Sequence, residues 1–430
     1  MENTKTNKNN RFNGLLKNKC EAEKSFAKLN FICALILYTG SLAVVLFFKI
    51  TGMDLGLIRF KTIFEDFART LSFALSKDPF APTADFSTSY MPFAILLIKP
   101  FALICSKFAG QNYAAINYTW QFYISYSLFL AVCTASIYFL FKKITGVTRR
   151  SSLINFASFF FSGLFIFTFI RGNIIFLSLI FTLLFLAFKD SKNKLIREIS
   201  LMSLAAAGVI KIYPLFFGVL LLKEKKFFQS FRVAVYFILL FFLPFLCFEK
   251  TPFNPSSWLV FKEYLSNVYL FGYLENRALS VVNLSSSALI TKLFYMTDLI
   301  FKTDTVKIAS LLEKIFALII IMAGTFATVK EKDKLKTYAL IVTVMIAVPS
   351  VSYFYCLIFL LVPFIEFIRE YDNIEEKSRR IYAITAVISF NAFLVITIIY
   401  FVYGIFFLAF IGYETVKAVK SMQSVKARIV

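Results

Sequence analysis

Histidine is missing from this 430-residue sequence, and its absence removes several classes of catalytic site. A His-based triad, a His-ligated metal and a histidine proton relay are all excluded. Six cysteines are present, but none has the Cys-x-x-Cys spacing of a zinc or redox site, and most fall inside apolar segments. The sequence therefore predicts neither a zinc site nor a disulfide framework.

Acidic residues are scarce: 25 Asp and Glu stand against 47 Lys and Arg, which gives a net charge of +22. In a soluble protein this balance would suggest nucleic acid, but no basic face is interleaved with exposed aromatic residues on a soluble module. The basic residues lie in short loops between long apolar runs, and 59% of all side chains are hydrophobic. We therefore expect an all-α polytopic membrane protein that contacts membrane lipids and no nucleic acid.

The alternation of apolar runs and basic loops predicts a topology with a cytoplasmic N-terminus. We expect about 10 to 12 transmembrane or re-entrant helices, because runs of about 20 apolar residues can cross the hydrocarbon layer. The predicted parts are a cytoplasmic polar tail (1–28), a single transmembrane domain (29–411) with outer loops at 57–110 and 249–304, and a basic tail (412–430). The segment 381–411 fits either one long span or two short ones.

Two apolar segments are interrupted in the middle. Lys211, Tyr213 and Pro214 break the segment 199–222, which has basic loops at both ends. A lysine inside a membrane costs about 2.5–3.5 kcal/mol, so it is a functional candidate. We predict two half-helices that meet at Lys211; the alternative is one kinked span with a snorkelling Lys211. A second break is expected at Pro349 to Tyr353.

The first outer loop contains an amphipathic segment, 57–75, and a proline-broken apolar piece, Tyr90 to Phe108, which we expect to be re-entrant. The apolar stripe of the amphipathic segment comprises Phe60, Phe64, Phe67, Leu71 and Leu75. Such a helix lies in a membrane interface, which would hold the Asp66 carboxylate where lipid head groups lie. The alternative is that Asp66 and Arg69, three residues apart, form an ordinary surface pair.

From Phe169 onward the sequence shows an ordered series of short motifs. The series is Arg171-Gly172-Asn173, an apolar helix, a basic loop, the small residues 205–208, Lys211-Ile212-Tyr213-Pro214, and the basic loop 223–226. Asp66-Phe67, Asp78-Pro79-Phe80 and Tyr90-Met91-Pro92 precede this series, and Asn276 to Ser280 and Pro349 to Tyr355 follow it. The order resembles the polyprenol-phosphate-dependent glycosyltransferases of family 87, which have the GT-C fold and include α-1,2-mannosyltransferases.

Three positions depart from the family pattern within the resembling region, which runs from about residue 30 to about residue 367. Met91 stands where proline is usual, and Ile175 stands where a second Asn often follows the Gly-Asn turn. Tyr355 or a neighbour replaces a common histidine.

The resemblance implies roles for individual residues. Asp66 would be the general base of an inverting sugar transfer. Arg171, Lys211 and Arg277 would bind the donor phosphate, although Arg277 also fits an exposed loop residue. The remaining candidate substrate-binding residues are Asn173, Tyr213, Tyr90 and Trp258.

The resemblance also implies the substrates and the location. The donor would be a polyprenyl-phosphate-linked hexose, mannose first, and the acceptor a lipid-linked or cell-envelope glycan at the outer face of the plasma membrane. No cofactor is demanded, while Asp66, Asp78 and Asp85 together could ligate Mg²⁺ or Ca²⁺. The competing functions are a lipid-linked sugar transporter or flippase, favoured by the paired broken helices, and a glycan polymerase or ligase.

Overall fold

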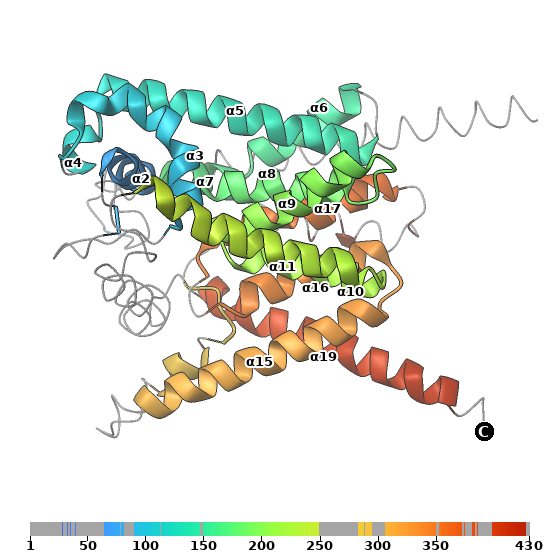
Figure 1. Cartoon of the computed structure of the whole chain (residues 1–430). Helices are drawn as coiled ribbons and strands as arrows, with labels where there is room; N and C mark the ends of the chain where they lie inside the picture. The colour runs from blue at the N-terminus through green and yellow to red at the C-terminus, as the bar shows by residue number, and fades with distance from the viewer. Residues whose placement is uncertain are drawn as a thin grey trace, which may run out of the picture.

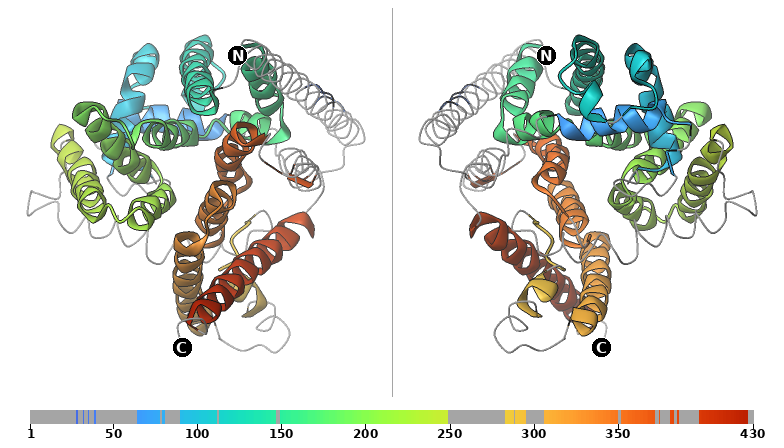
Figure 2. Two further views of the ribbon diagram at one scale, coloured as in Figure 1. Left: turned by 90° about the vertical axis from the view of Figure 1, so that its right-hand side faces the viewer. Right: turned by 90° about the vertical axis from the view of Figure 1, so that its left-hand side faces the viewer.

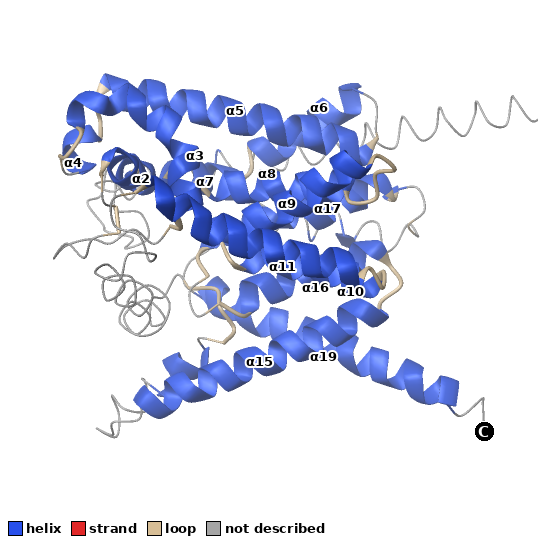
Figure 3. Ribbon diagram, in the orientation of Figure 1, coloured by secondary structure: helices blue, strands red, loops and turns tan. Residues whose placement is uncertain are grey.

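The computed structural model describes residues 64–77, 79–80, 90–111, 113–146, 149–248, 283–287, 289–294, 306–349, 352–371 and 398–426, together with a few isolated positions. Among these residues, helices and their connections make up the fold, and Figure 3 shows no strand in this part of the chain. One isolated antiparallel bridge joins Asn283 to Tyr353. The predicted all-helical class is therefore confirmed.

The first half of the described chain is a series of helices (Figure 1). They are α2 (Glu65–Leu75), α3 (Pro92–Ala102), η2 (Leu103–Phe108), α4 (Tyr113–Ile116), α5 (Trp120–Thr145), α6 (Arg149–Phe160), α7 (Gly163–Arg171), α8 (Ile175–Phe188) and α9 (Lys194–Ile210). The second half comprises η3 (Tyr213–Gly218), α10 (Val219–Lys223), α11 (Phe227–Phe242), η4 (Leu243–Cys247), α15 (Val306–Lys330), α16 (Lys334–Ala347), η7 (Phe354–Leu360), α17 (Leu361–Arg369) and α19 (Ile398–Lys426).

The chain is a multi-pass membrane protein. Within the described residues, three helices are long and apolar enough to cross a membrane: Trp120–Thr145, Phe227–Cys247 and Leu311–Lys330. A fourth candidate is the pair Ser152–Phe160 and Gly163–Arg171, which is bent by 55°. The bend occurs because the Ser162 side chain accepts a hydrogen bond from the Phe165 N–H and starts a new helix, α7.

The predicted break at Lys211 is confirmed. Helix α9 ends at Ile210, Lys211 is extended, and the chain resumes as the 3-10 helix η3. Both ends of this segment lie at the same end of the molecule, since the Lys226 ammonium donates to Asp190 at 2.6 Å and Lys189 pairs with Glu224. The segment is therefore a broken hairpin with Lys211 at its turning point.

A second broken hairpin follows the same plan. Helices α16 and α17 pack against each other; α16 ends at Ala347, and η7 begins at Phe354. The predicted break at Pro349 to Tyr353 is thus confirmed. We call the end that carries loops 189–193, 224–226 and 331–333 the basic end.

Helix α2 lies across the bundle instead of along it. Figure 1 looks almost down its axis, and Figure 2 shows it from the side, perpendicular to the long helices. Its buried face comprises Phe67, Ala68, Thr70, Leu71 and Ala74. Phe64 is the N-cap, with a left-handed backbone (φ 60°), and residues 57–63 of the predicted helix lie outside the described part of the chain.

Candidate functional site

Asp66 is held by two side chains that lie more than 100 residues further along the chain. The Arg171 guanidinium donates from Nη2 to Asp66 Oδ1 at 2.7 Å, and the Asn173 amide donates from Nδ2 to Oδ2 at 2.9 Å. The Asp66 side chain is 19% exposed and that of Arg171 35%, so the pair is partly open. Because each carboxylate oxygen can accept two hydrogen bonds, Asp66 keeps accepting capacity toward a substrate.

The turn that carries these partners needs glycine at its centre. Gly172 ends α7 in the left-handed region (φ 66°), where its N–H bonds the Phe169 carbonyl at 2.9 Å. A Cβ at Gly172 would lie 3.0 Å from Phe67 Cβ and 3.1 Å from Phe64 Cα. The absence of a side chain therefore lets α2 approach the turn closely.

Asn173 has two structural duties besides its contact with Asp66. Its Oδ1 accepts a hydrogen bond from the Ile175 N–H at 3.1 Å, which satisfies one of the free donors at the start of α8. Its side chain also shares a hydrogen bond with Tyr90. Asn173 is only 2% exposed, so it fixes the orientation of Asp66 rigidly.

The start of α2 is tied to the end of α7. The Phe64 N–H donates to the Ile170 carbonyl at 2.8 Å, and the Tyr126 hydroxyl of α5 donates to the Phe169 carbonyl at 2.5 Å. The fully buried Phe67 ring lies 4.9 Å from the Tyr126 ring, centroid to centroid. These contacts bring the start of α2 to the Arg171 turn.

The Lys211 cation lies over aromatic rings at the tip of the first broken hairpin. Its Nζ is 4.6 Å from the centroid of Tyr90 and 5.8 Å from that of Tyr355. The Tyr213 hydroxyl is 3.3 Å from Cys356 Sγ. Tyr90 thus links Lys211 to Asn173, so one cluster contains a carboxylate, two cations and several phenol groups.

The alternative, a surface pair of Asp66 with Arg69, is not what the structure shows. Arg69 instead forms an ion pair with Glu65, one helical turn earlier, and its guanidinium stacks on Tyr113 at 4.7 Å from the ring centroid. Four residues separate Arg69 from Glu65, so the two side chains lie one above the other on α2, while Asp66 points toward Arg171. Arg69 therefore does not contact the candidate base.

Six of the eight sequence-predicted site residues are described and lie in this region: Asp66, Tyr90, Arg171, Asn173, Lys211 and Tyr213. Arg277, Trp258, Asp78 and Asp85 lie outside the described residues. In the part of the chain that is described, no three His, Cys, Asp or Glu side chains gather to form a metal site. Sequence reasoning missed Cys356 and Tyr126, because a single Cys or Tyr in an apolar run carries no local signal.

An apolar groove begins beside Lys211. It has a volume of about 670 Å³ and lies between η3, α10, α11, α15 and α16. Its lining starts with Ile212 and Tyr213 and continues through Phe237 and Met345 toward Leu222. Ile212 and Ile238 in the lining are 59% and 54% exposed, so the groove opens onto the side of the bundle, where lipid chains lie.

Comparison with known proteins identifies the family of this chain. The family model described as Glycosyltransferase family 87 matches residues 88–358, more than half of the 430 residues. The chain belongs to glycosyltransferase family 87. No curated protein and no solved structure matches it.

The family 87 match covers most of the site residues, while Asp66 lies before the matched range. The matched range includes the Arg171 turn and the Lys211 break but starts after Asp66. The hydrogen bonds from Arg171 and Asn173 attach Asp66 to the matched region. As a family 87 protein, the chain is a membrane glycosyltransferase that takes a lipid-linked sugar donor and transfers the sugar to an acceptor.

Proposed function

We propose that this protein transfers a single hexose, mannose first among the candidates, from a polyprenyl-phosphate donor to a lipid-linked or cell-envelope glycan, with Asp66 as the general base. The observation that carries this proposal is the convergence of Asp66, Arg171, Asn173, Tyr90 and Lys211 from four separate segments. Charged groups that come from distant parts of the sequence and meet in a partly open site are typical of catalysis.

The proposed step is a single displacement with inversion. Asp66 accepts the proton of the acceptor hydroxyl while that oxygen attacks the anomeric carbon of the sugar. The bond between the anomeric carbon and the phosphate oxygen breaks, and polyprenyl phosphate leaves with the bonding electrons. Arg171 and Asn173 hold both oxygens of Asp66, so the base keeps one orientation during the step.

Lys211 is our primary candidate for the cation that binds the leaving phosphate. It has an ammonium group at the tip of a hairpin, and the apolar groove starts at the next residue, Ile212. A phosphate beside Lys211 would place the polyprenyl chain in the groove and the sugar toward Asp66. Arg171 is the second cation, because its guanidinium can pair with phosphate as well as carboxylate.

We further propose that the site faces the outside of the plasma membrane and that the N-terminus is cytoplasmic. The distribution of basic loops supports this orientation, because loops 189–193, 224–226 and 331–333 all lie at the basic end. The site lies at the opposite end of α8, a helix of 14 residues that separates Asn173 from Lys189 by about 21 Å at 1.5 Å per residue.

Purified protein in lipid nanodiscs, incubated with polyprenyl-monophosphate sugars and glycan acceptors, tests the proposal. We expect mass spectrometry to detect a product heavier than the acceptor by one hexose, together with free polyprenyl phosphate. Movement of the donor between leaflets without covalent change would favour a transporter or flippase. Transfer only from a diphosphate-linked oligosaccharide would favour a polymerase or ligase.

A further inference from the structure

A short polar segment, residues 283–287, is buried against the turning point of the second broken hairpin. All five of its residues are at most 1% exposed. They are Asn283, Leu284, Ser285, Ser286 and Ser287. Four polar side chains buried this deeply in an apolar protein need hydrogen-bond partners, and the turn supplies partners to Asn283, Ser285 and Ser287.

The segment satisfies the carbonyl groups that the end of α16 leaves free. The Ser287 N–H donates to the Ala347 carbonyl at 3.0 Å, and the Ser287 hydroxyl donates to the Val348 carbonyl at 2.8 Å. The Ser285 hydroxyl also donates to the Ala347 carbonyl, at 3.2 Å. The segment thereby replaces the helical turn that would have followed Ala347.

Asn283 is the residue that fixes the far side of the turn. Its Oδ1 accepts hydrogen bonds from the Ser352 N–H at 2.8 Å and the Ser285 N–H at 3.1 Å. The Leu284 N–H donates to the Ser352 carbonyl at 2.7 Å, and Asn283 forms the bridge with Tyr353. One amide oxygen therefore joins the segment to Ser352, two residues before η7 begins.

The start of η7 carries the groups that surround Lys211. Tyr355 lies within 5.8 Å of Lys211 Nζ, and Cys356 Sγ contacts the Tyr213 hydroxyl. Only two residues lie between Ser352 and Tyr355, so a shift at Ser352 moves the Tyr355 ring. We infer that segment 283–287 is a clamp that positions η7 against the Lys211 hairpin, with Asn283 as its principal positioning residue.

The clamp has two measurable consequences. Loss of the Asn283 oxygen leaves the N–H groups of Ser352 and Ser285 without their acceptor, so the turn opens more often and Cys356 becomes reactive. In the variant Asn283→Ala, we expect Cys356 to react with N-ethylmaleimide roughly tenfold faster than in the wild type. Sugar transfer should fall by a similar factor, roughly tenfold, because Tyr355 no longer holds its place beside Lys211.

The experiment follows alkylation of Cys356 by mass spectrometry in nanodiscs, and sugar transfer in the same samples. Asn283→Asp keeps an oxygen at the Oδ1 position and should restore both quantities to within a few-fold of the wild type. Asn155→Ala removes another buried asparagine, in α6, and should leave Cys356 labelling unchanged. If Asn283→Ala does not fold, Ser287→Ala, which removes one hydroxyl, should raise the labelling rate by a smaller factor.

The inference is overturned if Cys356 is alkylated at the wild-type rate in folded Asn283→Ala or in folded Ser287→Ala. It is also overturned if Asn283→Asp and Asn283→Ala change the alkylation rate equally. The catalytic consequence rests on the proposed function, but the labelling rate does not. An enzyme that transfers no sugar while its Cys356 labelling follows the expected order would refute the proposed function and leave the clamp in place.

Discussion

At the scale of single residues, the site depends on Asp66 and on the two side chains that hold its carboxylate. Asp66, Arg171 and Asn173 form the hydrogen-bonded core, and Gly172 permits it. The sequence suggested each of these residues through motif order, but it could not show that Arg171 pairs with Asp66. Contacts across about 100 residues depend on how helices pack, which local patterns do not encode.

Replacing Gly172 by alanine should damage the site through the backbone. A left-handed conformation costs a non-glycine residue about 1–2 kcal/mol, and the new Cβ would meet the backbone of Phe64. We expect Gly172→Ala to lower the melting temperature and to abolish most of the transfer activity. Gly146→Ala is the matched control, because Gly146 also has positive φ but has no atom near its Cβ position. Equal losses of activity in Gly172→Ala and Gly146→Ala would show that the close approach of α2 to Gly172 does not matter for the site.

Replacing Lys211 by methionine should remove the cation next to the groove and keep much of the side-chain volume. A charge-assisted hydrogen bond is worth about 1.5–3 kcal/mol, so kcat/KM for the donor should fall by about 10- to 100-fold. Lys107→Met is the control, since Lys107 Nζ also lies over aromatic rings, 4.9 Å from the Phe108 centroid, in a different helix. Unchanged donor kinetics in Lys211→Met would exclude Lys211 from phosphate binding.

At the scale of helices, both interrupted segments were predictable, and the reason is physical. Lys211 and Pro214 are poorly suited to the interior of a lipid-facing helix, so their positions marked the first turning point. The bend between α6 and α7 was not predictable, because Ser162 looks like any serine in an apolar run until its capping bond is seen. The role of Asn283 was not predictable either, because it depends on hydrogen bonds to Ser352 and Ser285 that the sequence does not show.

The apolar groove gives an element-scale prediction. A tryptophan at Ala234, which lines the groove on α11, should obstruct a long polyprenyl chain. We expect Ala234→Trp to raise KM several-fold for a long-chain donor and to have less effect on a farnesyl-phosphate donor, because burial of each CH₂ contributes about 0.8 kcal/mol. The measurement is KM for donors of both lengths.

Leu239→Trp is the control for the groove. Leu239 lies on the same helix, is 43% exposed and does not line the groove. An equal rise in KM for both donor lengths in Ala234→Trp, or the same chain-length effect in Leu239→Trp, would show that the polyprenyl chain lies elsewhere.

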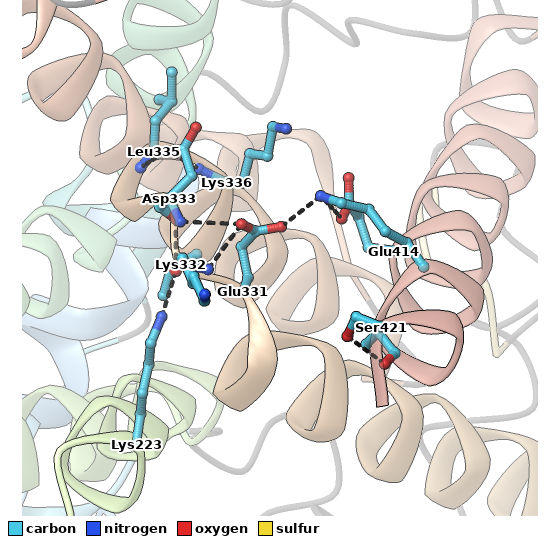
Figure 4. A network of polar contacts seen from close by, with 11 residues as sticks. Lys223, Glu331, Lys332, Asp333, Leu335, Lys336, Glu414 and Ser421 are labelled. Atoms are coloured by element: carbon cyan, nitrogen blue, oxygen red, sulfur yellow. Dashed lines mark hydrogen bonds and ion pairs between the residues drawn. The ribbon is translucent and has the colours of Figure 1, made fainter. Parts of the chain in front are cut away.

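At the scale of the whole molecule, charged side chains connect α19 to the loop between α15 and α16 at the basic end. Glu331, in the loop between α15 and α16, accepts a hydrogen bond from the Lys417 ammonium of α19 at 3.0 Å, and Glu414 accepts from the same group at 3.1 Å (Figure 4). The C-terminal half of α19 therefore lies at the end of the bundle that carries the basic loops. The sequence alone did not settle on which side this helix ends.

This junction predicts a dependence of stability on pH. Burial alone would raise the pKa of Glu331, but hydrogen bonds from the Asp333 N–H, the Lys417 ammonium and the Lys332 N–H outweigh it and lower the pKa to about 2. The unfolded value is about 4.3, so the stabilisation is present above that pH and is lost as the pH falls toward 2. We expect the wild-type melting temperature to drop between pH 5 and about 2.5, and Glu331→Gln to drop less. If the melting temperatures of the wild type and Glu331→Gln fall by the same amount over this pH range, the proposed role of Glu331 is wrong.

The central claim is that Asp66 is the general base of sugar transfer, and the variant Asp66→Asn tests it most directly. Glu65→Gln is the matched control, because it neutralises the adjacent carboxylate, which pairs with Arg69 and not with Arg171. Transfer of hexose from a polyprenyl-phosphate donor should be lost in folded Asp66→Asn, by a factor of about 100 or more, and kept in Glu65→Gln. Full activity in Asp66→Asn, or its loss in Glu65→Gln alone, would contradict the account.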